Sequence, residues 1–64
     1  MISIVIPTYN EAAVIQETLR RAAAALRSAA EEFELIVVDD ASGDGTAELA
    51  EALSGELPVR VLRR

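Results

Sequence analysis

The chain has 64 residues, enough for one small domain that buries only about 60% of the surface an unfolded chain exposes. It is 52% hydrophobic but only 3% aromatic, which predicts a core of alanine, valine, isoleucine and leucine. Eleven acidic residues against six arginines give a net charge of -5, so we expect no nucleic-acid partner. Histidine and cysteine are absent, which excludes a zinc ligand set, a thiol nucleophile and a disulfide framework.

The first half of the chain predicts a strand followed by a long helix. Ile2 to Ile6 is an apolar run rich in β-branched residues, typical of a strand buried on both faces, and Pro7 is expected to stop it. Beyond the PTYNE turn, apolar residues recur at spacings of four and three, which predicts a helix from about Glu11 to Ala30 with Asn10 as its N-cap. The apolar stripe of this helix consists of Ile15, Leu19, Ala22, Leu26 and Ala29.

The second half repeats the alternation. Phe33 to Val38 (FELIVV) predicts a second strand, because its β-branched residues disfavour a helix. Ala47 to Ser54 predicts a short helix ended by Gly55, and VRVL after Pro58 predicts a third strand. Strands and helices that alternate with short connections indicate an α/β fold. We therefore expect residues 1–64 to form a single three-stranded parallel βαβαβ unit, Rossmann-like, with strand order 3-2-1.

Two polar loops follow strands of this predicted sheet. The PTYNE loop comes after the first strand and the DDASGDGT loop after the second. The carboxyl ends of parallel strands share one edge of a sheet, and ligands of open α/β sheets bind at that edge. The chain contains neither GxGxxG nor GxxxxGK[ST], so it lacks both common phosphate-binding motifs. The sequence therefore places its candidate chemistry in carboxylates and hydroxyls of two adjoining loops.

The second loop also matches the spacing of a calcium-binding loop. The residues at loop positions 1, 3, 5, 6, 7 and 12 are Asp40, Ser42, Asp44, Gly45, Thr46 and Glu51. Against this alternative, a calcium loop of that type follows a helix, whereas FELIVV is strand-like. A calcium-binding module from Asp40 to Glu51 and a purely structural βαβαβ fragment both stay open as alternatives.

The stretches SIVIPTYNEA and FELIVVDDASGDGT, in this order and about thirty residues apart, resemble the N-terminal end of family 2 glycosyltransferases. The resemblance covers essentially the whole chain and is closest to the polyprenyl-phosphate (dolichol-phosphate) sugar transferases. It implies the N-terminal, nucleotide-sugar-binding part of an A-type glycosyltransferase domain. The donor implied is a UDP- or GDP-linked sugar, and the parent family is one of hexosyltransferases.

The resemblance also implies residue roles. The positions matching Pro7, Tyr9 and Glu11 line a nucleoside pocket, and a carboxylate of the Asp39-Asp40 pair accepts a hydrogen bond from the base. An ionised carboxylate only accepts, which suits the ring N–H of uracil or guanine. Neighbours on an extended segment point to opposite sides, so only one of the pair should face the pocket, and we favour Asp40.

Each of these side chains has a simpler explanation. Tyr9 could cover the end of the sheet, and Glu11 could be a first-turn acid stabilised by the helix dipole. For Asp44 and Ser42 we favour a role as N-cap of the second helix. The arginines near the C-terminus could approach a diphosphate, but we favour a basic strand edge that discourages aggregation. These arginines are Arg60, Arg63 and Arg64.

The resemblance further implies a divalent metal, Mg²⁺ or Mn²⁺, held in the full-length family by an Asp-x-Asp motif, and a later carboxylate that acts as general base. The 64 residues contain no such triplet. We therefore expect a truncated domain with no catalytic residue, which binds no metal and is inactive alone. The parent protein is expected at the cytoplasm or the cytoplasmic face of a membrane, with a lipid acceptor. The open edge of the first strand predicts self-association.

Overall fold

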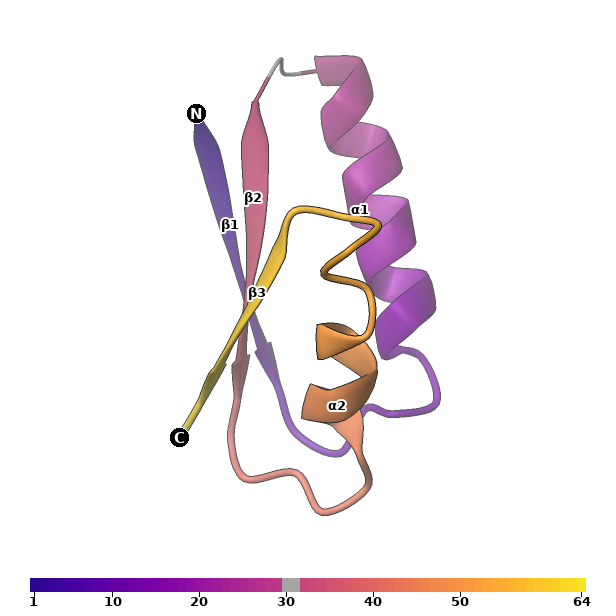
Figure 1. Ribbon diagram of the computed structural model, residues 1–64, viewed down its shortest axis with the longest axis vertical. Helices are drawn as coiled ribbons and strands as arrows, with labels where there is room; N and C mark the ends of the chain where they lie inside the picture. The colour runs from indigo at the N-terminus through magenta and orange to yellow at the C-terminus, as the bar shows by residue number, and fades with distance from the viewer. Residues whose placement is uncertain (30–31) are drawn as a thin grey trace.

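The computed structural model describes residues 1–29 and 32–64, which form three parallel strands alternating with two helices (Figure 1). The elements are β1 (Ile2–Thr8), α1 (Ile15–Ala29), β2 (Phe33–Asp39), α2 (Thr46–Glu51) and β3 (Val59–Arg63). The sheet order is β1-β2-β3, which is the predicted order 3-2-1 read from the other edge. The predicted α/β class and parallel βαβαβ arrangement are therefore confirmed.

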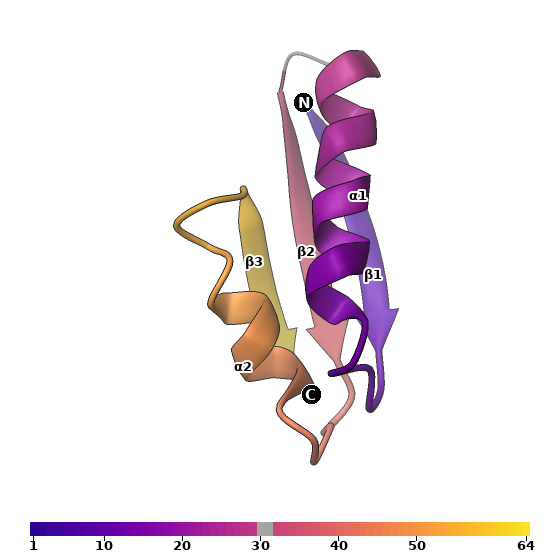
Figure 2. The ribbon, with the colours of Figure 1, turned by 90° about the vertical axis from the view of Figure 1, so that its right-hand side faces the viewer.

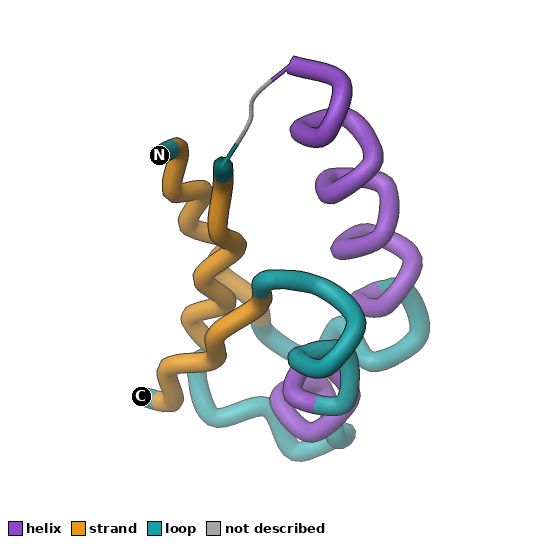
Figure 3. The backbone as a smooth tube through the Cα atoms, turned by 45° about the horizontal axis from the view of Figure 1, so that its top comes forward, coloured by secondary structure: helices purple, strands orange, loops and turns teal. Residues whose placement is uncertain are grey.

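The molecule has two layers, a sheet and a pair of helices that both cover the same face of it. Figure 2 shows α1 in front of β1 and β2 with α2 in front of β3, and Figure 3 shows the helices on one side of the strands. On the other face, Val5 is 60% exposed and Leu62 is 48% exposed. The expectation that the first strand is buried on both faces is therefore wrong, because no described element covers the second face.

The core lies between α1, α2 and the covered face of the sheet. Leu19 and Ala23 of α1 and Leu35 and Val37 of β2 are fully buried in one apolar cluster. Along β2, buried residues alternate with half-buried ones, so Asp39 continues the buried series after Leu35 and Val37. This pleat brings one carboxylate of the Asp39-Asp40 pair to the helix side of the sheet.

The first strand runs past the predicted stop at Pro7 and ends at Thr8. The N–H of Ile2 donates to the carbonyl of Glu32, and the carbonyl of Thr8 accepts from the N–H of Asp40. The even-numbered residues of β1 therefore bond to β2, while the polar main-chain groups of Ser3, Val5 and Pro7 face the open edge. Proline is tolerated at such an edge because its missing N–H would have no partner there.

Both helices differ from their predicted bounds. The first begins at Ile15 rather than Glu11, because Asn10 has a left-handed φ of 52° and residues 12–14 form a turn. Asn10 is therefore not an N-cap, and the predicted end at Ala30 lies outside the described residues. The second helix spans Thr46–Glu51, and turns replace its predicted last residues up to Ser54.

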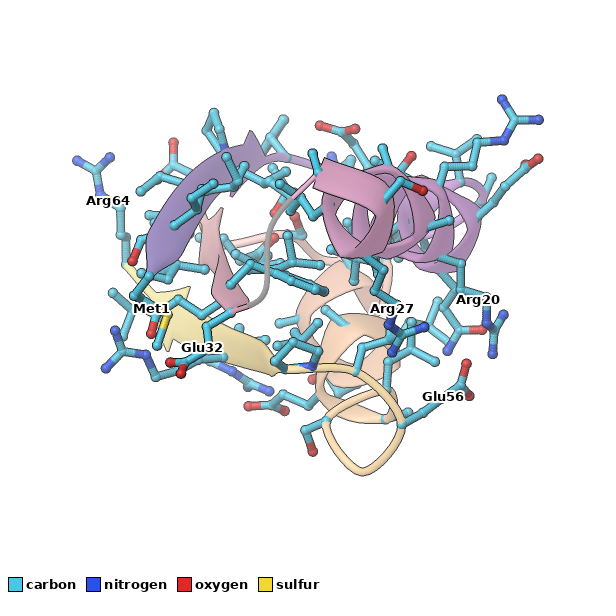
Figure 4. All side chains as sticks on the ribbon, turned by 90° about the horizontal axis from the view of Figure 1, so that it is seen from above. Met1, Arg20, Arg27, Glu32, Glu56 and Arg64 are labelled. Carbon is cyan, nitrogen blue, oxygen red and sulfur yellow. The ribbon has the colours of Figure 1, made fainter. Side chains whose placement is uncertain are left out.

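The end of the sheet where the strands begin is remote from the two polar loops. It has a shallow hollow of about 350 Å³, lined by Met1, Arg27, Glu32, Phe33 and Pro58. Figure 4 labels Met1, Arg27 and Glu32 of this group. Beside it, Nε of Arg20 lies 3.1 Å from a carboxylate oxygen of Glu56, and this pairing lowers the pKa of Glu56. The pair links α1 to the turn after α2, and, being exposed, it contributes little to stability.

Candidate functional site

The candidate site lies at the carboxyl ends of the strands, where the loops after β1 and β2 run side by side (Figure 1). Their starting points are neighbours because Thr8 pairs with Asp39 in the parallel register. The first loop carries Tyr9, Asn10 and Glu11, and the second runs from Asp40 to Gly45. As predicted, sequence-distant polar groups meet at the edge where open α/β sheets bind ligands.

Asp39 is the buried anchor of this site and is only 3% exposed. Its Oδ1 accepts from the hydroxyl of Thr8 at 2.8 Å and from that of Ser42 at 2.6 Å, and its Oδ2 accepts from the N–H of Ser42 at 3.0 Å. The Ser42 hydroxyl is the main cause that lowers the pKa of Asp39, and the Ser42 N–H, the Thr8 hydroxyl and the charge of Arg63 act in the same direction against burial. Asp39 is therefore an ionised acceptor that holds protein groups.

Ser42 connects Asp39 to the first loop. Its hydroxyl oxygen accepts from the N–H of Asn10 at 2.7 Å, and the side-chain carbonyl of Asn10 accepts in turn from the N–H of Gly43 at 3.1 Å. The two loops thus exchange two hydrogen bonds across 32 and 33 residues of sequence. The predicted role of Ser42 as a helix N-cap is wrong, because its hydroxyl is engaged with Asp39 and Asn10.

A second link lies at the start of α2. The N–H of Glu11 donates to the hydroxyl of Thr46 at 2.9 Å, and the N–H of Ala12 donates to Asp44 at 3.1 Å. The hydroxyl and N–H of Thr46 both donate to the other oxygen of Asp44, and the hydroxyl bond is the main cause that lowers the pKa of Asp44. Gly45 occupies the N-cap position with φ 91°, a left-handed conformation that suits glycine. Asp44 is therefore not the N-cap.

Four of the five predicted site residues are exposed. Tyr9 is 62% exposed, and Glu11 and Asp40 are exposed as well. One carboxylate oxygen of Glu11 accepts from the N–H of Tyr9 at 3.4 Å. Pro7 is exposed as well, one residue before Thr8 and therefore on the open face of β1. Asp39, the fifth predicted residue, faces the protein interior. Asp39 and Asp40 therefore face opposite sides, as the pleat predicts, with Asp39 buried and Asp40 exposed.

The loop motifs indicate no role for Thr8, and the helical pattern predicts Asn10 as a helix cap. Both residues hold the loops together, as do Ser42 and Thr46. The alternation of side chains along the strand does indicate a role for Thr8. It follows Ile4 and Ile6 on the covered face of the strand, where a buried hydroxyl needs a hydrogen-bond partner. In the described part of the chain, every buried side-chain nitrogen or oxygen has a hydrogen-bond partner.

The arginines at the end of β3 are engaged with carboxylates. Arg63 pairs with Glu51 at 2.5 Å and with Glu48 at 3.7 Å, and Arg60 pairs with Glu34 at 3.4 Å on the open face. Arg64 points away from the helices (Figure 4).

Within residues 1–29 and 32–64, no group of three or more acidic side chains lies close enough together to hold a metal ion. The oxygens of the calcium-like spacing are directed elsewhere, because Asp44 binds Thr46, Ser42 binds Asp39 and Glu51 binds Arg63. The geometry therefore does not support the calcium alternative.

Comparison with known proteins gives a consistent result. The family model described as glycosyl transferase family 2 matches residues 3–64. The chain is 52% identical over 52 residues to the undecaprenyl-phosphate 4-deoxy-4-formamido-L-arabinose transferase of Pseudomonas paraeruginosa, covering 81% of the chain and 15% of that protein. It is 44% identical over 63 residues to the dolichol-phosphate mannosyltransferase of Pyrococcus furiosus, covering 98% of the chain and 17% of that protein. None of the helices in the described residues is long and apolar enough to cross a membrane.

Proposed function

Because the chain belongs to glycosyl transferase family 2, we propose that it is the segment that recognises the nucleoside of a UDP- or GDP-linked sugar donor. The observation that carries the proposal is the exposed carboxylate of Asp40, next to the loop that presents Tyr9 and Glu11 at the carboxyl edge of the sheet. Ligands of open α/β sheets bind at this edge.

The chemistry of the exposed side chains suits a nucleoside. An ionised carboxylate such as Asp40 only accepts hydrogen bonds, and a uracil or guanine ring offers an N–H to it. The ring of Tyr9 offers a flat apolar face to a base or a ribose, and Glu11 can accept from ribose hydroxyls. Pro7 borders the loop, while Asp39 supports the site from beneath through Ser42 and Thr8.

A nucleotide titration of the chain followed by NMR tests the proposal. UDP and GDP should shift the signals of Tyr9, Glu11 and Asp40, and Asp40→Asn should weaken binding about tenfold because a carboxylate that binds an N–H is replaced by an amide. Glu32→Gln is the matched control, since it removes one exposed acid at the end of the sheet where the strands begin, away from both loops. If neither nucleotide moves the three signals, the proposed function is wrong.

The chain spans 15% to 17% of the length of the curated relatives quoted above, whose names describe transfer to undecaprenyl phosphate and to dolichol phosphate. We infer a parent enzyme that transfers a sugar to a polyprenyl-phosphate acceptor at the cytoplasmic face of a membrane. The divalent metal that this family generally uses has no ligand set among the described residues. The 64-residue chain is therefore proposed to bind the nucleoside without catalysing transfer.

We also propose that the chain self-associates through the open edge of β1. The polar main-chain groups of Ser3 and Val5 face this edge, and β1 carries no charged side chain. The opposite edge strand, β3, carries the long charged side chains of Arg60 and Arg63, which discourage pairing with another strand. An uncharged apolar edge is a template for pairing with a second strand, and the partner proposed is a second copy of the chain.

A further inference from the structure

Asn10 is the residue of the first loop that separates two exposed side chains of the proposed site. It lies between Tyr9 and Glu11 and has a left-handed φ of 52°, so the chain reverses its twist between these two residues. Asparagine tolerates this conformation better than most residues, but the right-handed alternative remains the lower-energy one for an isolated L-residue. Contacts with the second loop therefore have to hold Asn10 in place.

Those contacts form a reciprocal pair, which we call the latch, made by Asn10, Ser42 and Gly43. The N–H of Asn10 donates to the Ser42 hydroxyl at 2.7 Å, and the N–H of Gly43 donates to Oδ1 of Asn10 at 3.1 Å. One bond therefore involves the main chain of Asn10 and the other its side chain. A rotation of Asn10 out of the left-handed region would break both bonds.

The buried Asp39 determines which groups donate and which accept in the hydrogen bonds of the latch. A serine hydroxyl has one proton, and here it donates that proton to Oδ1 of Asp39 at 2.6 Å. The lone pairs of the hydroxyl are then directed towards the N–H of Asn10. The N–H of Ser42 donates to Oδ2 of Asp39 at 3.0 Å, so both oxygens of the carboxylate orient Ser42. The chain of bonds runs from the core, through Asp39 and Ser42, to the residue between Tyr9 and Glu11.

We propose that Ser42 is a positioning residue of the nucleoside site, which acts through Asn10 to hold Tyr9 and Glu11 in place opposite Asp40. This inference rests on the proposed function. It assigns Ser42 no contact with the ligand, because its hydroxyl is already bonded to Asp39 and Asn10. Ser42 therefore contributes to affinity by setting the geometry of the first loop before the ligand arrives, so that less ordering is needed on binding.

Substitution of Ser42, with UDP and GDP as probes, tests the inference. Ser42→Ala should raise the dissociation constant of the bound nucleotide about threefold to tenfold, which corresponds to the loss of one or two hydrogen bonds. Ser42→Thr keeps a hydroxyl and should restore most of the affinity. Ser54→Ala is the matched control, because Ser54 is an exposed serine in the turn after α2. The substitution removes the same hydroxyl oxygen far from the latch.

Two further measurements separate positioning from a general loss of structure. Circular dichroism at 10 °C should give the same folded signal for all variants, and the amide signals of Asn10 and Gly43 should shift in Ser42→Ala but not in Ser54→Ala. A second variant, Asn10→Gly, keeps access to the left-handed conformation and removes only the bond to Gly43. It should weaken nucleotide binding as well, by about threefold.

The outcomes distinguish this inference from the proposed function. If the unsubstituted chain binds neither UDP nor GDP, the proposed function and the positioning role fall together. If the unsubstituted chain binds and Ser42→Ala binds with the same dissociation constant, Ser42 is only structural, while the proposed function stands. Weaker binding by Ser42→Ala, restored by Ser42→Thr at an unchanged folded signal, supports the inference.

Discussion

Replacing Ala41 by glycine should stabilise the protein. Ala41 has a φ of 54°, a left-handed conformation that places the Cβ of an L-residue too close to the following carbonyl oxygen. The side chain is exposed, so its removal exposes no core surface. Relief of the left-handed conformation is worth about 1–2 kcal/mol. The greater freedom of glycine in the unfolded chain costs about 0.5–1 kcal/mol.

The midpoints of the two ranges leave a gain of about 0.75 kcal/mol in the free energy of unfolding. For a domain of this size, that corresponds to a rise in melting temperature of about 3–6 °C. Thermal and urea unfolding followed by circular dichroism at 222 nm would measure both quantities. The folded state has enough helix for this signal, because α1 alone contributes 15 residues.

The same substitution elsewhere in the chain provides the control. Ala25 is also exposed but lies in the middle of α1, where glycine costs about 1 kcal/mol relative to alanine. Ala25→Gly should therefore lower the melting temperature while Ala41→Gly raises it. Equal losses in the two variants would refute the reasoning, since they would mean that Ala41 pays no conformational penalty in the folded state.

Three other predictions concern acid stability, calcium and association. Hydrogen bonds lower the pKa of Asp39, so its carboxylate stabilises the fold above about pH 4, and this contribution is lost as the pH falls through the lowered pKa. Asp39→Asn should therefore lower the melting temperature at pH 7 and make it decline less steeply between pH 4 and pH 2. An equally steep decline in the variant and the unsubstituted chain would contradict this. Calcium chloride at about 5 mM should leave the melting temperature unchanged, because the loop oxygens do not converge; a rise abolished by Glu51→Gln would restore the calcium hypothesis. Val5→Pro removes an N–H from the open edge of β1 and should give a monomer in sedimentation. Leu62→Lys, on the open face of β3, should leave the association unchanged. The opposite pattern would place the contact between copies on the face of the sheet.

The course of the main chain followed largely from local patterns. Short β-branched runs such as Ile2 to Ile6 and Phe33 to Val38 predict strands because those side chains lose rotamer freedom in a helix. The alternation of strands with helical stripes then predicts a parallel sheet and its order. Strand and helix ends were less predictable, since Pro7 is accommodated by an edge position that local sequence does not reveal.

Residue patterns alone predict the α/β class, the meeting of the two loops at one edge of the sheet, and membership of a sugar-transferase family through its two motifs. Which carboxylate of the Asp39-Asp40 pair is buried depends on the packing of the helices on the sheet. The pleat requires Asp39 and Asp40 to face opposite sides, but the position of the helices determines which side is the interior. The latch was equally hidden, because hydrogen bonds between Asn10 and Ser42 join residues 32 apart in sequence. Local propensities describe neighbours along the chain, and these contacts exist only after the sheet has placed two distant loops together.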